Sequence, residues 1–196
     1  MSTVYTIGHS SHTFETFAGL LAGHDIEVVV DTRSSPYSKY APQFSREALQ
    51  RDLAVCGVKY LFLGEELGGR PRGDDYYDTT GRVLYGKRTG DAKFLAGIER
   101  LERGMDQFRV ALMCGEEDPA HCHRRLLIGR VLVERGHNLL HIRADGHLDD
   151  EAEVERQSKK PLATKQPALF AELDEDQWRS TASVSPKKAP ESSSAR

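Results

Sequence analysis

The sequence predicts an α/β fold, a single doubly wound domain in which helices flank a mostly parallel sheet of about five strands. Two observations predict it. Short segments rich in β-branched and apolar residues recur along the chain, and segments with helical spacing of apolar residues lie between them. A chain that alternates strands and helices builds parallel strands joined by right-handed crossovers. The length of 196 residues allows one domain with a substantial core.

The strands are expected at five places: residues 4–8, 26–33, 58–64, 108–114 and 138–142. Between them, apolar side chains three or four positions apart define helical faces. These faces are Phe14, Phe17, Leu20 and Leu21; Leu49, Leu53 and Cys56; Phe94, Leu95, Ile98 and Leu101; and Leu127, Ile128, Val131 and Leu132. Cys56 is therefore expected in the core.

Residues that favour helix ends flank these segments. Plausible N-caps are Thr13, Ser45 and Asp91. Each expected helix then runs into a glycine, which tolerates the left-handed conformation that ends many helices. These glycines are Gly23, Gly57, Gly104 and Gly136.

The alternating pattern stops near residue 149. We therefore expect an α/β domain over residues 1–148, followed over residues 149–196 by a linker and a largely disordered C-terminal tail. Residues 180–196 are rich in Ser, Ala, Lys and Pro and too poor in large apolar residues to build a core. A short docking element is one reading of Ala168, Leu169, Phe170, Leu173 and Trp178; a partly ordered linker is the other.

Composition restricts the partners and the location of the protein. The formal charge of -3 provides no global attraction to nucleic acid or membranes. No apolar run is long enough to span a bilayer, and the first eight residues lack a secretory signal, so a cytoplasmic location without membrane association is expected. Three cysteines are an odd number, which favours reduced thiols over structural disulfides. The sequence indicates no particular cofactor or oligomeric state.

Polar residues follow the expected strands at their carboxyl ends. They are His9 and Ser10 after the first strand, Asp31 and Arg33 at the end of the second, Glu65 after the third, and Cys114 and Glu116 at the end of the fourth. Ligands of doubly wound sheets bind at this edge. Because acids, bases and thiols with perturbed pKa values cluster at functional sites, the set predicts a site there.

The densest polar segment joins Cys114 to Arg124, and three interpretations of its cysteines stay open. Cys114 and Cys122 could form a redox or nucleophilic pair, since the seven intervening residues permit their sulfurs to meet. They could also bind a metal together with His123 and either His9 or Asp31, although the spacing is not that of a zinc ribbon. The third interpretation is that both cysteines only pack, because cysteine is among the most often buried residue types.

A long polar loop over residues 70–88 separates the third strand from the next helix. Loops of this length are usually lids, binding loops or disordered. The loop combines basic and aromatic side chains, namely Arg70, Arg72, Lys87 and Arg88 with Tyr76, Tyr77 and Tyr85. Such a set could stack on a base while holding phosphates. A solvated loop whose tyrosines pack on its own base is the alternative.

Four motifs together resemble a bacterial and archaeal family, domain of unknown function 488. They are the Thr-Ile-Gly-His-Ser run at 6–10, the Asp-Thr-Arg-Ser-Ser-Pro run at 31–36, the Gly-rich turn at 64–69 and the segment 112–124. The resemblance covers roughly residues 4–145 and implies a compact α/β domain, but no reaction. It implies that His9, Asp31, Arg33, Glu65, Cys114, Glu116, Cys122, His123 and Arg124 are motif positions. Thr32 stands where the family pattern leads us to expect Val.

We expect an enzyme that acts on a small anionic or nucleotide-like substrate. Arg33 and Arg124 would hold the anion, and Cys114 or Cys122 would supply a nucleophilic or redox thiolate. Proton transfer would fall to His9, Glu116 or His123. Further binding residues are expected at Ser10, Asp31, Glu65, Arg70 and Tyr77. The alternatives are a nucleic-acid or nucleotide binding module that uses the loop 70–88, and a metal-binding protein that uses Cys114, Cys122 and His residues.

Overall fold

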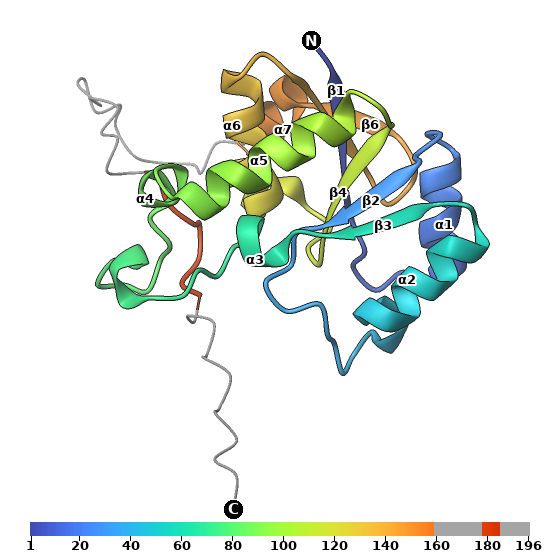
Figure 1. The fold of residues 1–196 in the computed structure, drawn as a ribbon, viewed down its shortest axis with the longest axis horizontal. Helices are drawn as coiled ribbons and strands as arrows, with labels where there is room; N and C mark the ends of the chain where they lie inside the picture. The colour runs from blue at the N-terminus through green and yellow to red at the C-terminus, as the bar shows by residue number, and fades with distance from the viewer. Residues whose placement is uncertain (159–177, 185–196) are drawn as a thin grey trace, which may run out of the picture.

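A computed structural model describes residues 1–158 and 178–184, which form an α/β fold around a six-stranded sheet (Figure 1). The strand order is β3-β2-β4-β1-β5-β6. All neighbouring strands are parallel except β5 and β6, which pair antiparallel. The predicted mostly parallel sheet is therefore confirmed. The strands are β1 (Thr3–Gly8), β2 (Val28–Asp31), β3 (Lys59–Phe62), β4 (Val110–Cys114), β5 (Asn138–Ile142) and β6 (Leu148–Asp150).

Strand β6 is the one described strand that the apolar pattern did not predict, and the helices α3, α4 and α7 were not predicted either. The strand covers three residues, with only the middle one buried, so it carries no apolar run. A tight turn creates it: the N–H of Gly146, at φ 89°, donates to the carbonyl of Arg143. The chain then reverses and pairs with β5.

Helices cover both faces of the sheet. They are α1 (Phe14–Ala22), α2 (Arg46–Val55), α3 (Gly64–Leu67), α4 (Tyr85–Thr89), α5 (Ala92–Met105), α6 (Arg130–Glu134) and α7 (Glu151–Ser158), with a π-helical turn at Arg124–Gly129 that continues into α6. The apolar faces of α1 and α2 pack into one core, while α5 and α6 contribute to the other. Within the described part of the chain, no helix has the length and apolar character needed to cross a bilayer.

Successive residues of β2 illustrate how the sheet fills both cores. Val28 and Val30 pack on the side of α5, whereas Val29 packs on the side of α1 and α2. Because side chains alternate along a strand, a strand that is covered on both faces must be apolar at every position. The polar residue that ends this strand, Asp31, is consequently also buried and needs a partner.

The helix ends agree in part with the sequence. Thr13 and Asp91 cap α1 and α5 by accepting hydrogen bonds from backbone N–H groups, while Ser45 occupies the N-cap of α2 without such a bond. Gly23 follows the last residue of α1, but its φ of -61° is not the left-handed conformation that the expectation assumed. Helix α5 instead continues through Gly104 to Met105, so the stop expected at that glycine was wrong.

Cys56 was expected in the core and is instead exposed. The expectation assumed that the helix continues through residue 56, which would place this thiol on the face of Leu49 and Leu53. Helix α2 ends at Val55, and Gly57, at φ 76°, turns the chain away. Cys56 is thus a thiol outside the core.

The chain beyond residue 148 continues the domain. The boundary expected there falls inside β6, and α7 follows directly. Residues 178–184, called the C-terminal segment from here on, return to the domain, where Trp178 donates its indole N–H to the carbonyl of Leu126 at 2.6 Å. The other residues of the expected docking element lie outside the described residues, as does the tail from 185 onward.

Candidate functional site

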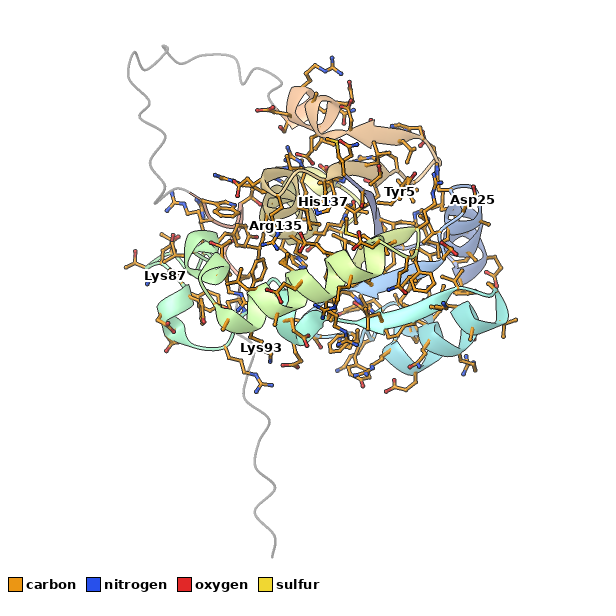
Figure 2. All side chains as sticks on the ribbon, turned by 45° about the horizontal axis from the view of Figure 1, so that its top comes forward. Tyr5, Asp25, Lys87, Lys93, Arg135 and His137 are labelled. Atoms are coloured by element: carbon orange, nitrogen blue, oxygen red, sulfur yellow. The ribbon has the colours of Figure 1, made fainter. Side chains whose placement is uncertain are left out.

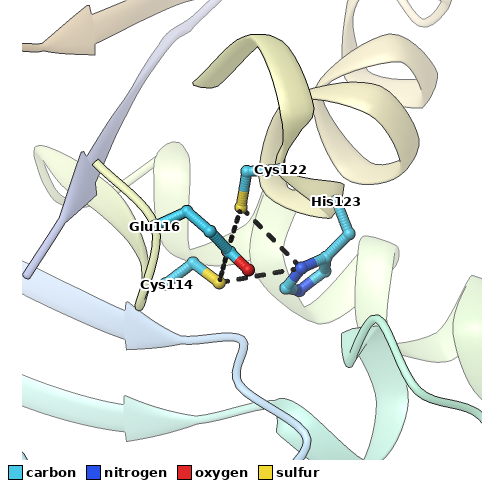
Figure 3. A group of neighbouring side chains, drawn as sticks. All are labelled: Cys114, Glu116, Cys122 and His123. Atoms are coloured by element: carbon cyan, nitrogen blue, oxygen red, sulfur yellow. Dashed lines mark hydrogen bonds between the residues drawn. The ribbon is translucent and has the colours of Figure 1, made fainter. Parts of the chain in front are cut away.

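Four side chains with metal-binding chemistry meet where β4 ends. Cys114 is the last residue of β4, and Glu116 follows two positions later. Cys122 and His123 directly precede the π-helical turn. Figure 3 shows the thiols, the carboxylate and the imidazole pointing toward one another from the strand end and the start of the helix.

The distances within this cluster are short. The Sγ atoms of Cys114 and Cys122 each lie 3.0 Å from Oε2 of Glu116. The Nδ1 atom of His123 lies 3.7 Å from the first sulfur and 3.9 Å from the second. One donor atom from each of the four side chains thus lies within 4.8 Å of the others. No second group of this kind occurs in residues 1–158 or 178–184. We call these four residues the Cys-Glu-His cluster.

A backbone contact orients the imidazole of His123. Its Nε2 lies 3.0 Å from the carbonyl oxygen of Thr32, which can only accept a hydrogen bond. Nε2 therefore carries the proton, and the lone pair of the neutral ring lies on Nδ1, facing the sulfurs. Gly69 permits this position, because a Cβ atom there would come within 2.7 Å of the His123 ring.

The loop between the two cysteines is held by Arg124, which is fully buried. Its guanidinium donates to the carbonyl oxygens of Glu116 and Glu117 and to the hydroxyl of Thr6. Gly8 lets the loop approach β1, since a Cβ atom there would come within 1.9 Å of the Glu116 carbonyl oxygen. Each of the three guanidinium nitrogens of Arg124 thus has a partner within the protein, and these contacts shape the loop.

Protonation within the cluster depends on its own hydrogen bonds. The exposed fraction of Cys114 is 5% and that of Cys122 is 1%, while Glu116 reaches solvent. Hydrogen bonding with Cys122, followed by burial, raises the pKa of the Cys114 thiol well above its ordinary value. Burial would raise the pKa of Glu116, but hydrogen bonds from the two thiols outweigh it and lower that pKa to about 2. Without a cation, Cys114 is therefore a thiol beside an ionised carboxylate.

A second polar group, which we call the Asp-Arg-His group, lies at the same sheet edge and consists of Asp31, Arg33 and His9. Asp31 accepts two hydrogen bonds from the guanidinium of Arg33, at 2.9 and 2.7 Å, and one from the hydroxyl of Tyr60 at 2.8 Å. Arg33 also donates to the carbonyl of Phe44. A buried ion pair with this many partners neutralises itself.

His9 completes the Asp-Arg-His group. Its Nδ1 lies 3.0 Å from the carbonyl oxygen of Ser10, and its Nε2 lies 3.1 Å from the guanidinium of Arg33. The ring also stacks on Phe44. Burial and the adjacent Arg33 charge lower the pKa of His9. Both ring nitrogens of a neutral His9 are therefore occupied within the protein.

A pocket of about 420 Å³ opens onto the Cys-Glu-His cluster. Cys114, Glu116 and His123 line it, together with Arg70, Tyr85 and part of the C-terminal segment. Glu116 is the one acid among the described residues that line this pocket, whereas its bases include arginines and histidines. The pocket is thus lined both by three members of the Cys-Glu-His cluster and by basic residues.

The remaining predicted site residues are dispersed. Ser10 has φ 44° and donates its backbone N–H to the carbonyl of Gly115, so it helps to hold the loop of the cluster. Glu65 is directed toward Lys93 and Arg72, at 3.6 and 3.9 Å, and does not line the pocket. Of the predicted anion-binding residues, Arg33 and Arg70 line it.

The loop 70–88 buries one of the four basic side chains expected to hold phosphates, Arg88, and leaves the other three exposed. Arg88 is 4% exposed and donates to Asp91 and to the carbonyl of Glu66. The hydroxyl of Tyr77 donates to the carbonyl of Pro71 at 2.9 Å. Lys87 lies at the outer edge of α4, toward solvent (Figure 2). Burial of Arg88 removes it from the nucleic-acid surface that the sequence suggested.

Two parts of the pocket had no clear signal in the sequence. Tyr85 was only one of several tyrosines in the loop 70–88, and the structure alone places its ring at the pocket. Ser180 and Thr181 lie in a stretch whose composition is that of a tail, yet they also line the pocket. Their contribution depends on the return of the chain to the loop 70–88, where Ser180 contacts Val83, 97 residues earlier in the sequence. Local sequence patterns do not encode such a contact.

The described geometry can now be set beside known proteins. A family model with the description "Domain of unknown function DUF488" matches residues 13–131, which include three of the four motifs and all of the Cys-Glu-His cluster. Searches among curated proteins and among solved structures gave no match.

Proposed function

The chain belongs to the DUF488 family of domains of unknown function, and we propose that this member is a zinc-dependent enzyme that acts on a small anionic substrate. Cys114, Cys122 and His123 would bind the metal, and Glu116 would occupy an exchangeable fourth position. The observation that carries the proposal is the convergence of two sulfurs, one imidazole nitrogen and one carboxylate oxygen within 4.8 Å.

The spacing of these atoms suits a tetrahedral ion. With zinc about 2.3 Å from sulfur and about 2.0–2.1 Å from nitrogen, sulfur and nitrogen ligands lie roughly 3.6 Å apart. The corresponding distances to Nδ1 of His123 are 3.7 and 3.9 Å. The carboxylate oxygen is closer to the sulfurs, at 3.0 Å, because thiol protons bridge them. Loss of those protons and a small rotation of Glu116 would open the centre.

The surroundings also favour a metal over a free nucleophilic thiol. A thiol is nucleophilic as its thiolate, and the raised pKa of Cys114 keeps it protonated in the absence of a cation. A divalent ion would replace those two protons, which leaves the net charge of the cluster unchanged and stabilises both sulfurs as thiolates. The hydrogen bond from His123 to the Thr32 carbonyl is the kind of outer contact that orients metal-binding histidines.

Ligand type indicates zinc among the candidate metals. Two thiolates and an imidazole are soft or intermediate donors, which disfavour magnesium and calcium. Tetrahedral sites with two sulfurs are typical of zinc.

Access to the pocket favours a catalytic centre over a structural one. Structural zinc sites are closed by four protein ligands, whereas catalytic sites have three protein ligands and an open position. Glu116 is the exposed member of the Cys-Glu-His cluster and lines the pocket, so water or substrate can replace it. A zinc ion lowers the pKa of bound water to about 7 and polarises carbonyl or phosphoryl oxygens. A displaced Glu116, still ionised, could then accept a proton.

The pocket lining indicates the substrate charge. Arg70 and His121 are exposed residues at the pocket, and Glu116 is the one acid among its described lining residues. A metal bound at the cluster would offer a Lewis-acidic position to an anionic oxygen. The proposed substrate is therefore a small anion or a nucleotide-like molecule, in keeping with a volume of about 420 Å³.

Metal content tests this proposal. Protein purified without an affinity tag and equilibrated with zinc should retain one ion per chain after removal of excess metal. Cys114→Ser and Cys122→Ser should lose it, because each replaces a thiolate ligand. Cys56→Ser is the matched control, since Cys56 is exposed and distant from the cluster in sequence and fold, and it should retain the metal. Equal retention in all variants, or no uptake by the wild type, refutes the proposal.

A redox thiol pair is the second candidate, supported by the same proximity of Cys114 and Cys122 and by their reduced state. In that case the wild type would bind no zinc, and a mild oxidant would remove both thiols together, leaving Cys56 reactive. Thiol titration with and without zinc separates the two functions. Protection of two thiols by zinc supports the metal centre.

A further inference from the structure

We propose that Tyr85 is the substrate-binding donor of this site and that its hydroxyl donates a hydrogen bond to an oxyanion bound at the metal. The inference rests on the proposed metal centre and names the ligand class that the centre accepts. A phosphate group and a carboxylate group both supply such an oxyanion. Nothing in the loop 70–88 as a sequence distinguishes Tyr85 from its neighbouring tyrosines.

The position of Tyr85 is the first support. Its exposed fraction is 2%, yet it lines the same pocket as Cys114, Glu116 and His123. Burial is the main cause that raises the pKa of its hydroxyl, and the Glu116 carboxylate adds to it. A phenol in this place keeps its proton and acts as a donor.

The free hydroxyl is the second support. Tyr76 and Tyr77 donate their hydroxyl protons to Asp91 and to the Pro71 carbonyl. Among residues 1–158 and 178–184, no group forms a hydrogen bond with the Tyr85 hydroxyl. Buried tyrosine hydroxyls usually have partners, so a donor that faces a basic pocket is suited to a ligand oxygen.

The C-terminal segment holds Tyr85 in this position. The backbone N–H of Tyr85 donates to the Trp178 carbonyl at 2.8 Å, and the two rings meet edge to face with centroids 6.4 Å apart. Val83 and Ser180 exchange two further hydrogen bonds. Arg179 pairs with Asp78 at 3.1 Å. A side chain fixed on both flanks loses little entropy when it binds a ligand.

Charge accounts for the choice of an oxyanion. Arg70 supplies a cationic side chain at the pocket, and a bound metal would supply a Lewis-acidic position whose charge the two thiolates balance. Tyr85 adds a neutral donor that stays protonated. One cationic side chain, one metal position and one donor around a cavity of about 420 Å³ match a ligand with several negatively charged oxygens.

Cobalt(II) is a suitable probe, because it replaces zinc in tetrahedral sites and has visible absorption bands that respond to its ligands. The full chain loaded with cobalt would be titrated with inorganic phosphate and, separately, with acetate. We expect saturable spectral changes with at least one of the anions. Tighter binding of phosphate would identify phosphoryl substrates, and tighter binding of acetate would identify carboxylates; either result supports the inference.

Tyr85→Phe keeps the ring and its packing but removes the donor. It should retain cobalt at one ion per chain and weaken anion binding roughly 10- to 100-fold, as expected for the loss of one hydrogen bond to a charged group. Tyr76→Phe is the control, since its hydroxyl contacts Asp91, and it should bind the anion as the wild type does.

The outcomes distinguish this inference from the proposed function. Wild-type protein that binds no cobalt refutes the metal centre, and the role of Tyr85 with it. Cobalt binding with no response to either anion, or with equal anion affinity in Tyr85→Phe and wild type, overturns the inference alone. Trp178→Ala offers a second variant: it should weaken anion binding while cobalt is retained, because Tyr85 loses the ring that packs against it edge to face and residue 178 loses its side-chain hydrogen bond to Leu126.

Discussion

Two polar groups lie at the same edge of the sheet, and they differ in how far their hydrogen-bonding capacity is already used. In the Asp-Arg-His group, the carboxylate, the guanidinium and both nitrogens of His9 have protein partners. In the Cys-Glu-His cluster, Nδ1 of His123 and two thiols converge on one exposed carboxylate. The first group is complete as a neutral assembly, whereas the second gathers four potential metal ligands around one point.

The difference shows how a site is recognised among polar residues. Titratable residues at strand ends point to a functional edge, and both groups satisfy that criterion. They differ in how many lone pairs and protons stay available for a ligand once the hydrogen bonds within the protein are counted. By this measure, the Asp-Arg-His group supports the framework, and the Cys-Glu-His cluster is the candidate for chemistry.

The largest expected effect concerns the stability of the Asp-Arg-His group. Arg33→Met leaves the fully buried Asp31 carboxylate without its cation, which should lower the free energy of unfolding by about 3–5 kcal/mol. Denaturant unfolding measures this loss. The folded fraction should still bind one zinc ion per chain. If the folded variant loses its metal, the two groups act as one site and the comparison fails.

A smaller effect is expected at Gly69, where space for His123 is needed. In Gly69→Ala, the new Cβ would come within 2.7 Å of the ring, which must leave its present position beside the sulfurs. Zinc affinity should fall about 10- to 100-fold, in the range seen for altered outer contacts of metal ligands. Competition with a chromophoric chelator measures it. Gly86→Ala is the control because a Cβ there meets nothing within 4 Å; unchanged affinity in Gly69→Ala would contradict the assigned position of His123.

The smallest effect is the pH dependence conferred by a buried histidine outside the cluster. His141 contacts Thr6 and Glu151 through its two nitrogens, and burial lowers its pKa below the ordinary 6.5. Between the folded and unfolded pKa values, His141 therefore binds a proton in the unfolded chain and stays neutral in the folded chain. Stability should fall as the pH drops below 6.5, by at most about 1.4 kcal/mol per unit. His141→Gln should flatten this slope in unfolding experiments from pH 7 to about pH 5; an unchanged slope would assign the effect elsewhere.

Much of the fold follows from local pattern. The five parallel strands, the caps at Thr13 and Asp91 and the strand-end location of the site were all read from short-range signals. The failures have local causes as well. Strand β6 depends on a turn and on pairing with β5 rather than on apolar residues, and Cys56 changes environment because its helix ends one residue earlier.

The site could be predicted only in part. The sequence identified Cys114, Cys122 and His123 as metal-ligand types, but placed His9 or Asp31 as the fourth member. The structure brings in Glu116 instead, because the loop folds back over β1 at Gly8 and is held there by the buried guanidinium of a neighbouring arginine. Such long-range backbone contacts decide which side chains meet, and they cannot be inferred from the spacing of residues in the sequence.

X-ray absorption at the zinc edge tests the central claim most directly. In zinc-loaded wild-type protein, the account predicts two sulfur scatterers at about 2.3 Å and two nitrogen or oxygen scatterers at about 2.0–2.1 Å. Cys122→Ser, if it retains any metal, should show one sulfur. A first shell made only of nitrogen and oxygen, or protein that takes up no zinc, would contradict the account.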